Sequence, residues 1–286
     1  MTPSASSLAA LLLLLAVPAL AGGQALGLKH PVLDPKVDKG NPSQYEQFLG
    51  PVLALTEEQL RDYVPQWTYV QYCECPRCYG GVEGNGVFTW SPDQPQLMTC
   101  RFCKLVWPDP KYPETEVLTG KNLRGEEVSL PYYQSPDGVT HFLSLHLAML
   151  RRKWLLQQAD ALARAYVATE KPAYARRVAV ILDLFAQRYP HYPVMQNLPR
   201  RIAFREQKAP WPWDSGRWNF FHNNIPIELL PAYDMVYLSP EFDRLSAERG
   251  YDVRERLEQD FLKPSCEEIM LRTDHVNNCV GYDVRS

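Results

Sequence analysis

The sequence predicts a mainly α-helical protein with a small cysteine-rich β module in front of the helical body. Two amphipathic stretches after residue 140 predict long helices, and two C-x-x-C pairs precede them amid glycine, proline and aromatic residues. With 286 residues, of which 45% are hydrophobic, the chain is long enough to bury a substantial core.

The first predicted helix begins near His141 and places apolar side chains at the i, i+3, i+4 and i+7 spacing of one helix face. These side chains are Leu143, Leu147, Leu150, Trp154, Leu155, Leu162 and Tyr166. The sequence Glu170-Lys171-Pro172 ends this helix, and Pro172 suits the first turn of a second helix that continues to Pro190. Because the link is so short, we expect the two helices to pack antiparallel as a hairpin.

The remaining helices are expected at about residues 220–238 and 240–271, after a loop rich in proline and tryptophan. Ahead of the hairpin, residues 22–66 are rich in proline and irregular. They contain one short helix, for which Thr56 is the predicted N-cap. Residues 67–113 form the cysteine-rich module, and residues 114–140 are expected to be a loop.

The N-terminus predicts export. Residues 8–20 form an apolar run that is too short to span a bilayer, and Ala19-Leu20-Ala21 has the A-x-A pattern of a cleavage site. We therefore expect residues 1–21 to be a signal peptide and the protein to be secreted or periplasmic. No later segment predicts a membrane span. The net charge of -3 lacks the basic character of a nucleic-acid-binding protein.

Two C-x-x-C pairs, Cys75/Cys78 and Cys100/Cys103, supply four sulfur ligands and predict a structural zinc site of the zinc-ribbon kind. No coordination position would stay open for chemistry, and no organic cofactor is expected. Since the protein is predicted to be exported, two disulfides between the pairs are the alternative. Cys73 is a possible substitute ligand. Cys266 and Cys279 are packing residues or one further disulfide.

Histidine and asparagine gather at two places, His222-Asn223 and His275-Val276-Asn277-Asn278. Histidine can act as a general acid or base near neutral pH, and an asparagine amide can hydrogen-bond a sugar carboxylate. The structural alternative is that asparagine caps helices and histidine fills polar core positions. Nearby aromatic residues are candidate sugar platforms or packing residues, namely Trp211, Trp213 and Trp218.

Three segments together resemble the heparinase II/III-like and alginate-lyase-like polysaccharide lyases. They are ADALARAYVATEKPAYARRVAVILDLFAQRYPHY, PAYDMVY and HVNNCVGYD, and the resemblance covers roughly residues 140–286. It implies that residues 114–286 form an incomplete (α/α) toroid of antiparallel helical hairpins. Members of that family continue with further toroid helices and a β-sandwich, so this chain is expected to be truncated and inactive alone.

The resemblance also implies β-elimination on an acidic, uronate-containing polysaccharide. Asn278, or Asn277, matches the asparagine that neutralises the uronate carboxylate, with His275 nearby. His222 and Asn223 are expected to line the substrate cleft.

Two alternatives remain to the lyase. The first is a glycoside hydrolase on the same toroid, which would need two carboxylates facing one cleft, with Asp214, Glu228 and Asp234 as candidates. The second is a non-catalytic, glycan-binding surface protein that uses the tryptophan-rich loop.

Overall fold

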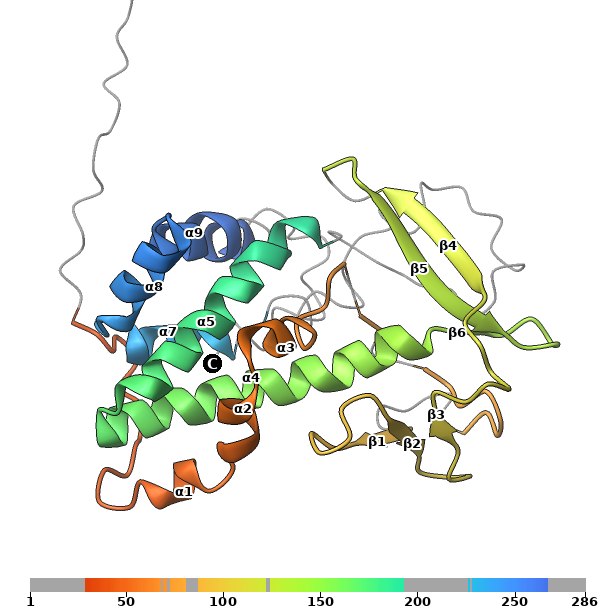
Figure 1. Ribbon diagram of the computed structural model, residues 1–286, viewed down its shortest axis with the longest axis horizontal. Coiled ribbons are helices and arrows are strands. Elements are labelled where there is room, and N and C mark those ends of the chain that lie inside the picture. Colours follow the sequence, from red (N-terminus) through yellow and green to blue (C-terminus); the bar gives the residue numbers. More distant parts are fainter. Residues whose placement is uncertain are drawn as a thin grey trace, which may run out of the picture.

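One long helix, α4 (Leu143–Thr169), runs through the computed structural model and contributes to both of its hydrophobic cores (Figure 1). Leu143 and Leu147, in its first turns, pack into the core of the β module, whereas Leu155 and Leu162 pack into the helical core. The structure describes residues 29–67, 69–70, 73–80, 87–121, 124–192, 226 and 228–266.

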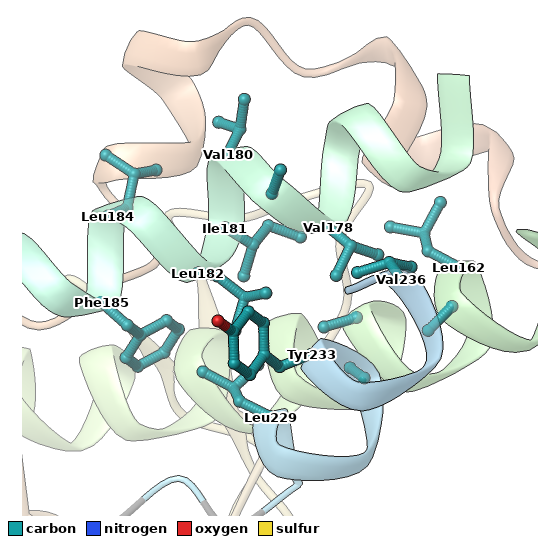
Figure 2. Close-up of a cluster of buried hydrophobic side chains, with 14 of the residues drawn as sticks. Leu162, Val178, Val180, Ile181, Leu182, Leu184, Phe185, Leu229, Tyr233 and Val236 are labelled. Carbon is teal, nitrogen blue, oxygen red and sulfur yellow. The ribbon is translucent and has the colours of Figure 1, made fainter. Parts of the chain in front are cut away.

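The helical core forms where α5 (Pro172–Arg188) folds back along α4 and α7 (Leu229–Val236) packs against both (Figure 2). Pro172 is the first residue of α5, and Glu170, in the left-handed conformation with φ 56°, ends α4. The predicted helical hairpin is therefore confirmed. Among the described helices, none combines the length and the apolar character that crossing a bilayer requires.

The predicted helical stretch over residues 240–271 is interrupted. Gly250 adopts φ 74° and ends α8 (Glu241–Arg249), since glycine enters the left-handed region without a steric penalty. Asp252 then accepts hydrogen bonds from two amide groups and begins α9 (Val253–Leu257), which continues into a π-helical turn, η3 (Glu258–Leu262). Of the helix expected at 220–238, the described part is α7.

The described part of the proline-rich N-terminal segment, residues 29–66, contains three short helices instead of the single one expected. They are α1 (Ser43–Glu46), α2 (Gly50–Ala54) and α3 (Glu57–Arg61). The prediction for α3 is confirmed, because the Thr56 hydroxyl accepts a hydrogen bond from the amide of Gln59 and the Gln59 side chain accepts one from the amide of Thr56. Burial of apolar side chains such as Val52 and Leu60 fixes the segment on the helical core.

The cysteine-rich module is built on a small antiparallel sheet, as predicted. Its strands β1 (Phe88–Trp90), β2 (Met98–Cys100) and β3 (Val106–Trp107) pair in sequence order. Met98 and Cys100 are fully buried, so the inner face of β2 points into the core that the module shares with the first turns of α4.

The expectation that residues 114–140 are a loop is wrong. They form β4 (Glu116–Lys121), β5 (Glu127–Gln134) and β6 (Thr140–His141), which pair antiparallel in the order β4-β5-β6. Along β5 every second side chain, Val128, Leu130 and Tyr132, is buried. This alternation packs one face of the hairpin onto the module core and leaves the other face towards solvent.

Candidate metal centre

The two C-x-x-C turns bring four thiol groups to one point. The Sγ atoms of Cys75 and Cys103 are 3.6 Å apart, those of Cys78 and Cys100 are 3.7 Å apart, and all four lie within 4.8 Å of one another. Thiolates on a tetrahedral zinc ion with Zn–S bonds of about 2.3 Å are about 3.8 Å apart. A disulfide needs about 2.05 Å. The four cysteines are free thiols at metal-binding spacing, which favours the metal over the disulfide alternative.

Both turns have the same backbone geometry. The amide of Tyr79 donates to the carbonyl of Cys75 at 2.9 Å, and the amide of Lys104 donates to the carbonyl of Cys100 at 3.0 Å. Tyr79 and Lys104 both adopt positive φ angles, 55° and 63°. Each turn therefore reverses the chain within five residues and directs its two thiol groups to the same side.

Glycine is required where the turns meet. A Cβ atom on Gly80 would lie 2.5 Å from a ring carbon of Phe102, a separation that real Cβ atoms do not tolerate. The ring of the second turn thus lies directly on the backbone of the first. This contact connects the two turns beside the cysteine pairs.

The four thiol groups differ electrostatically. Burial raises the pKa of Cys75 and of Cys78. Burial also raises the pKa of Cys103, but a hydrogen bond from the backbone at Leu105 and the neighbouring thiols outweigh it, and the pKa is about 7. Metal ions bind thiolates, so Cys103 is the group that is ionised most readily for the first bond to a metal.

Cys73, the predicted substitute ligand, does not join this set. Its thiol is buried and donates to the carbonyl of Glu74 at 3.6 Å. Burial raises the pKa of Cys73 well above that of an ordinary thiol. A neutral, buried thiol packs as a small apolar side chain.

The centre lies where the β module joins the helical body. The carbonyl of Glu74, next to the first ligand, lies 3.0 Å from Nδ1 of His141, the last residue of β6. The Tyr79 ring contacts the His141 ring edge-on at 5.8 Å, and its hydroxyl donates to Asp137 at 2.9 Å. A bound ion would therefore tie the first turn, the second sheet and the start of α4 together.

The residues predicted to handle sugar lie outside the described part of the chain. They are Trp211, Trp213, Trp218, His222, Asn223, His275, Asn277 and Asn278. The predicted signal peptide, Asp214 and Cys279 also lie outside it.

Asp234, a carboxylate of the hydrolase alternative, anchors the N-terminal segment to α7. It accepts hydrogen bonds from the amides of Val32 and Leu33, both at 2.8 Å, and lies 2.7 Å from Nδ1 of His30. Partial burial raises the pKa of Asp234, but these hydrogen bonds outweigh it and the pKa is lowered. Since Glu228 is exposed just before α7, the described residues provide no pair of these carboxylates facing one cleft.

A small basic pocket was not predicted. It has a volume of about 170 Å³ and is lined by Arg61, Trp67, Gln187, Arg188 and His191. Its residues come from α3, from the segment after it, from the end of α5 and from the 3-10 helix η1 (Tyr189–His191) that follows, so no local motif identifies it.

Comparison with known proteins adds no relative: no family model, curated protein sequence or solved structure matches this chain.

Proposed function

We propose that the four-cysteine centre binds one structural zinc ion. The observation that carries this proposal is the near-tetrahedral spacing of the Sγ atoms of Cys75, Cys78, Cys100 and Cys103. Four sulfur ligands leave no open position for water or substrate, so the ion would stabilise the fold without taking part in a reaction. Binding would also offset the cost of bringing four thiols together, two of which, Cys75 and Cys100, are buried.

We further propose that the helical body belongs to an exported polysaccharide lyase with an (α/α) toroid. The proposal rests on the sequence resemblance and is supported by the packing of two of its segments. Residues 159–192 span most of the α4–α5 hairpin, and residues 231–237 include most of α7, which packs on it. Paired antiparallel helices of this kind are the repeating unit of such a toroid.

In this proposal the reaction is β-elimination at a uronate. An amide of Asn278 or Asn277 would hydrogen-bond the sugar carboxylate and favour its neutral form. The adjacent C5 proton would then be easier to remove, because the resulting carbanion is no longer beside a full negative charge. His275 would lie close to the same carboxylate. The engagement of Asp234 in a structural contact counts against the hydrolase alternative.

The test is a degradation assay on the protein expressed from its whole gene. Uronate polymers such as alginate and heparan-type chains are incubated with the protein, and the ultraviolet absorbance of the unsaturated uronate ends is followed. We expect Asn278→Ala to lower the rate on the order of 100-fold, and Asn41→Ala, in an exposed turn, to leave it unchanged.

Each other outcome identifies a different function. New reducing ends without the absorbance would mean hydrolysis and would contradict the lyase. Binding of the polymer without degradation would favour the glycan-binding alternative.

A further inference from the structure

The pocket between α3 and the end of α5 concentrates positive charge. Arg61 is the last residue of α3 and Arg188 the last residue of α5, and both line the pocket beside Trp67 and His191. The volume of about 170 Å³ is below the ~300–1,000 Å³ usual for whole small-molecule ligands. The pocket is therefore suited to one functional group or to the protruding end of a larger molecule.

Arg188 has no opposite charge in direct contact. Within the described part of the chain its guanidinium forms no hydrogen bond or ion pair, although the side chain is only partly exposed. Burial lowers the pKa of Arg188; the charge of Arg61 also lowers it, whereas Tyr192 and Asp62 raise it. A desolvated guanidinium without a partner is unfavourable, and an anion bound beside it would remove that cost.

Arg61 is held in place by an amide that is itself fixed. Nη1 of Arg61 donates to Oε1 of Gln187 at 3.3 Å. Nε2 of Gln187 donates to Asp183 at 2.8 Å and lies 3.2 Å from the hydroxyl of Tyr251. Because both ends of the amide are engaged, its oxygen points towards Arg61 and leaves the other donors of that guanidinium for a ligand.

The carboxylate of Glu126, which contacts the lining residue His191, is already engaged. Oε2 of Glu126 lies 2.6 Å from Nδ1 of His191, and Oε1 lies 3.6 Å from Nε of Arg124. The edge-to-face contact between Trp67 and His191, with ring centroids 5.9 Å apart, fixes the aromatic wall. The indole therefore provides an apolar surface next to the two guanidinium groups.

A third arginine adds to the positive field. Arg152 is only 6% exposed, and its guanidinium lies 4.7 Å from the ring centre of Tyr69. Its Nε and one terminal nitrogen have no hydrogen-bond partner among the described residues. Burial raises the pKa of Tyr192, whereas the charges of both Arg152 and Arg188 lower it, so both arginines act on the same phenol. The charge of Arg152 therefore adds to the positive potential around Arg188.

We propose that this pocket binds an oxyanion, a carboxylate or sulfate group, between the guanidinium groups of Arg61 and Arg188, with Trp67 against the apolar part of the ligand. Guanidinium groups match the planar, bidentate geometry of carboxylates and the oxygen array of sulfate. The inference is independent of the proposed lyase activity, since it concerns binding of a small anion without turnover.

The test titrates the protein with sodium glucuronate, with sodium sulfate and with neutral glucose at constant ionic strength. Binding is followed in two-dimensional NMR spectra through the Arg188 Nε–H and the Trp67 indole N–H, the latter assigned with Trp67→Phe. We expect saturable shifts with glucuronate or sulfate and none with glucose. The anion that binds more tightly identifies the preferred group.

Variants localise the site. Arg188→Gln and Arg61→Gln are each expected to weaken binding at least about tenfold, since each removes charge-assisted hydrogen bonds. Arg176→Gln is the matched control, because Arg176 lies on the same helix but pairs with Glu248. Thermal melts check that each variant folds. Because Arg61 is exposed, Arg61→Gln should have little effect on packing. Equal shifts with glucose, no saturable shift with either anion, or unchanged affinity in both variants would overturn the proposal.

Discussion

Asp183 has no exposed surface, and its carboxylate lies 2.8 Å from Gln187 Nε2, 2.9 Å from Arg249 Nε and 2.7 Å from the Tyr251 hydroxyl. One residue of α5 thus joins the end of α8 and the turn that follows it. Arg249 has a second partner, Glu57, at the start of α3. Asp183 and Arg249 together therefore connect α3, α5 and α8.

Replacing Asp183 should be costly. Asp183→Asn is expected to lower the free energy of unfolding by about 2 to 3 kcal/mol, because Arg249 loses a buried partner. Asp160→Asn is the control: it breaks a more exposed pair with Arg164 on α4 and should cost less than about 0.5 kcal/mol. Urea unfolding of both variants makes the comparison, and equal costs would contradict the role given to Asp183.

Asp234 predicts a pH dependence of stability. Its folded-state pKa is lowered, so its stabilisation is fully present above the unfolded value of about 3.9 and is lost as the pH falls through the lower folded value. We expect Asp234→Asn to cost about 1 kcal/mol at neutral pH. The difference in the free energy of unfolding between the wild type and Asp234→Asn should shrink below about pH 4. Unfolding at a series of pH values measures it; a difference that does not change with pH would argue against the anchor.

At the scale of elements, α4 begins without a capping side chain of its own. Phe142 is the N-cap residue, and the carboxylate of Glu114 instead accepts hydrogen bonds from the amide of Ser144 at 3.1 and 3.3 Å. Burial raises the pKa of Glu114, whereas these hydrogen bonds lower it, and the pKa is raised overall. A residue of the preceding segment therefore completes the first turn of the longest described helix.

Removing this cap gives a direct prediction. Glu114→Ala should lower the free energy of unfolding by about 1 kcal/mol, the usual cost of a lost helix cap. Glu116→Ala, at an exposed position two residues further on, should have little effect. Thermal unfolding of the two variants distinguishes them, and identical melting temperatures would mean that the contact does not stabilise α4.

The sequence predicted elements whose pattern is local. The α4–α5 hairpin follows from periodic leucines and from Pro172. Gly250 ends α8 because glycine adopts a positive φ without a steric penalty. The strand β5 is not expected from the sequence because it contains Pro131, and proline disfavours the interior of a strand. Pro131 lies opposite Val117 of β4. On the other side of β5, β6 pairs only with Tyr133 and Gln134, so it requires no hydrogen bond from Pro131.

The sites, too, could be predicted where their residues lie close together in the sequence and not where tertiary packing assembles them. Each C-x-x-C turn is short and supplies two sulfurs, so the four sulfurs of the two turns could be recognised as one set. Arg61 and Gln187 lie 126 positions apart, and only tertiary packing brings them into one pocket. The predicted sugar-handling residues, such as Asn278, stay predictions because they lie outside the described part of the chain.

The described residues form two hydrophobic cores, and the four-cysteine cluster belongs to only one of them. Cys75 and Cys100 are part of the β module core, whereas the helical core is built around α5 and α7. Trp90 packs against both, and α4 passes through both. The helical core should therefore keep its structure when the metal is removed.

Hydrogen exchange after treatment with a strong zinc chelator tests this separation. Amide protection in β1–β3 is expected to fall, because the turns would lose the ion that we propose holds their thiolates, whereas protection in the middle of α5 persists. The control is the protein incubated with a chelator that is already saturated with zinc. Simultaneous loss of protection in both regions would contradict the separation of the cores.

The most direct measurement is the metal content and sulfur coordination of the purified protein. We expect one zinc ion per chain by elemental analysis, and an X-ray absorption spectrum with four sulfur neighbours at about 2.3 Å. Replacing Cys78 and Cys103 together by serine should abolish binding, whereas Cys73→Ala should not. A protein without zinc whose intact mass shows Cys75, Cys78, Cys100 and Cys103 oxidised to two disulfides would contradict the account.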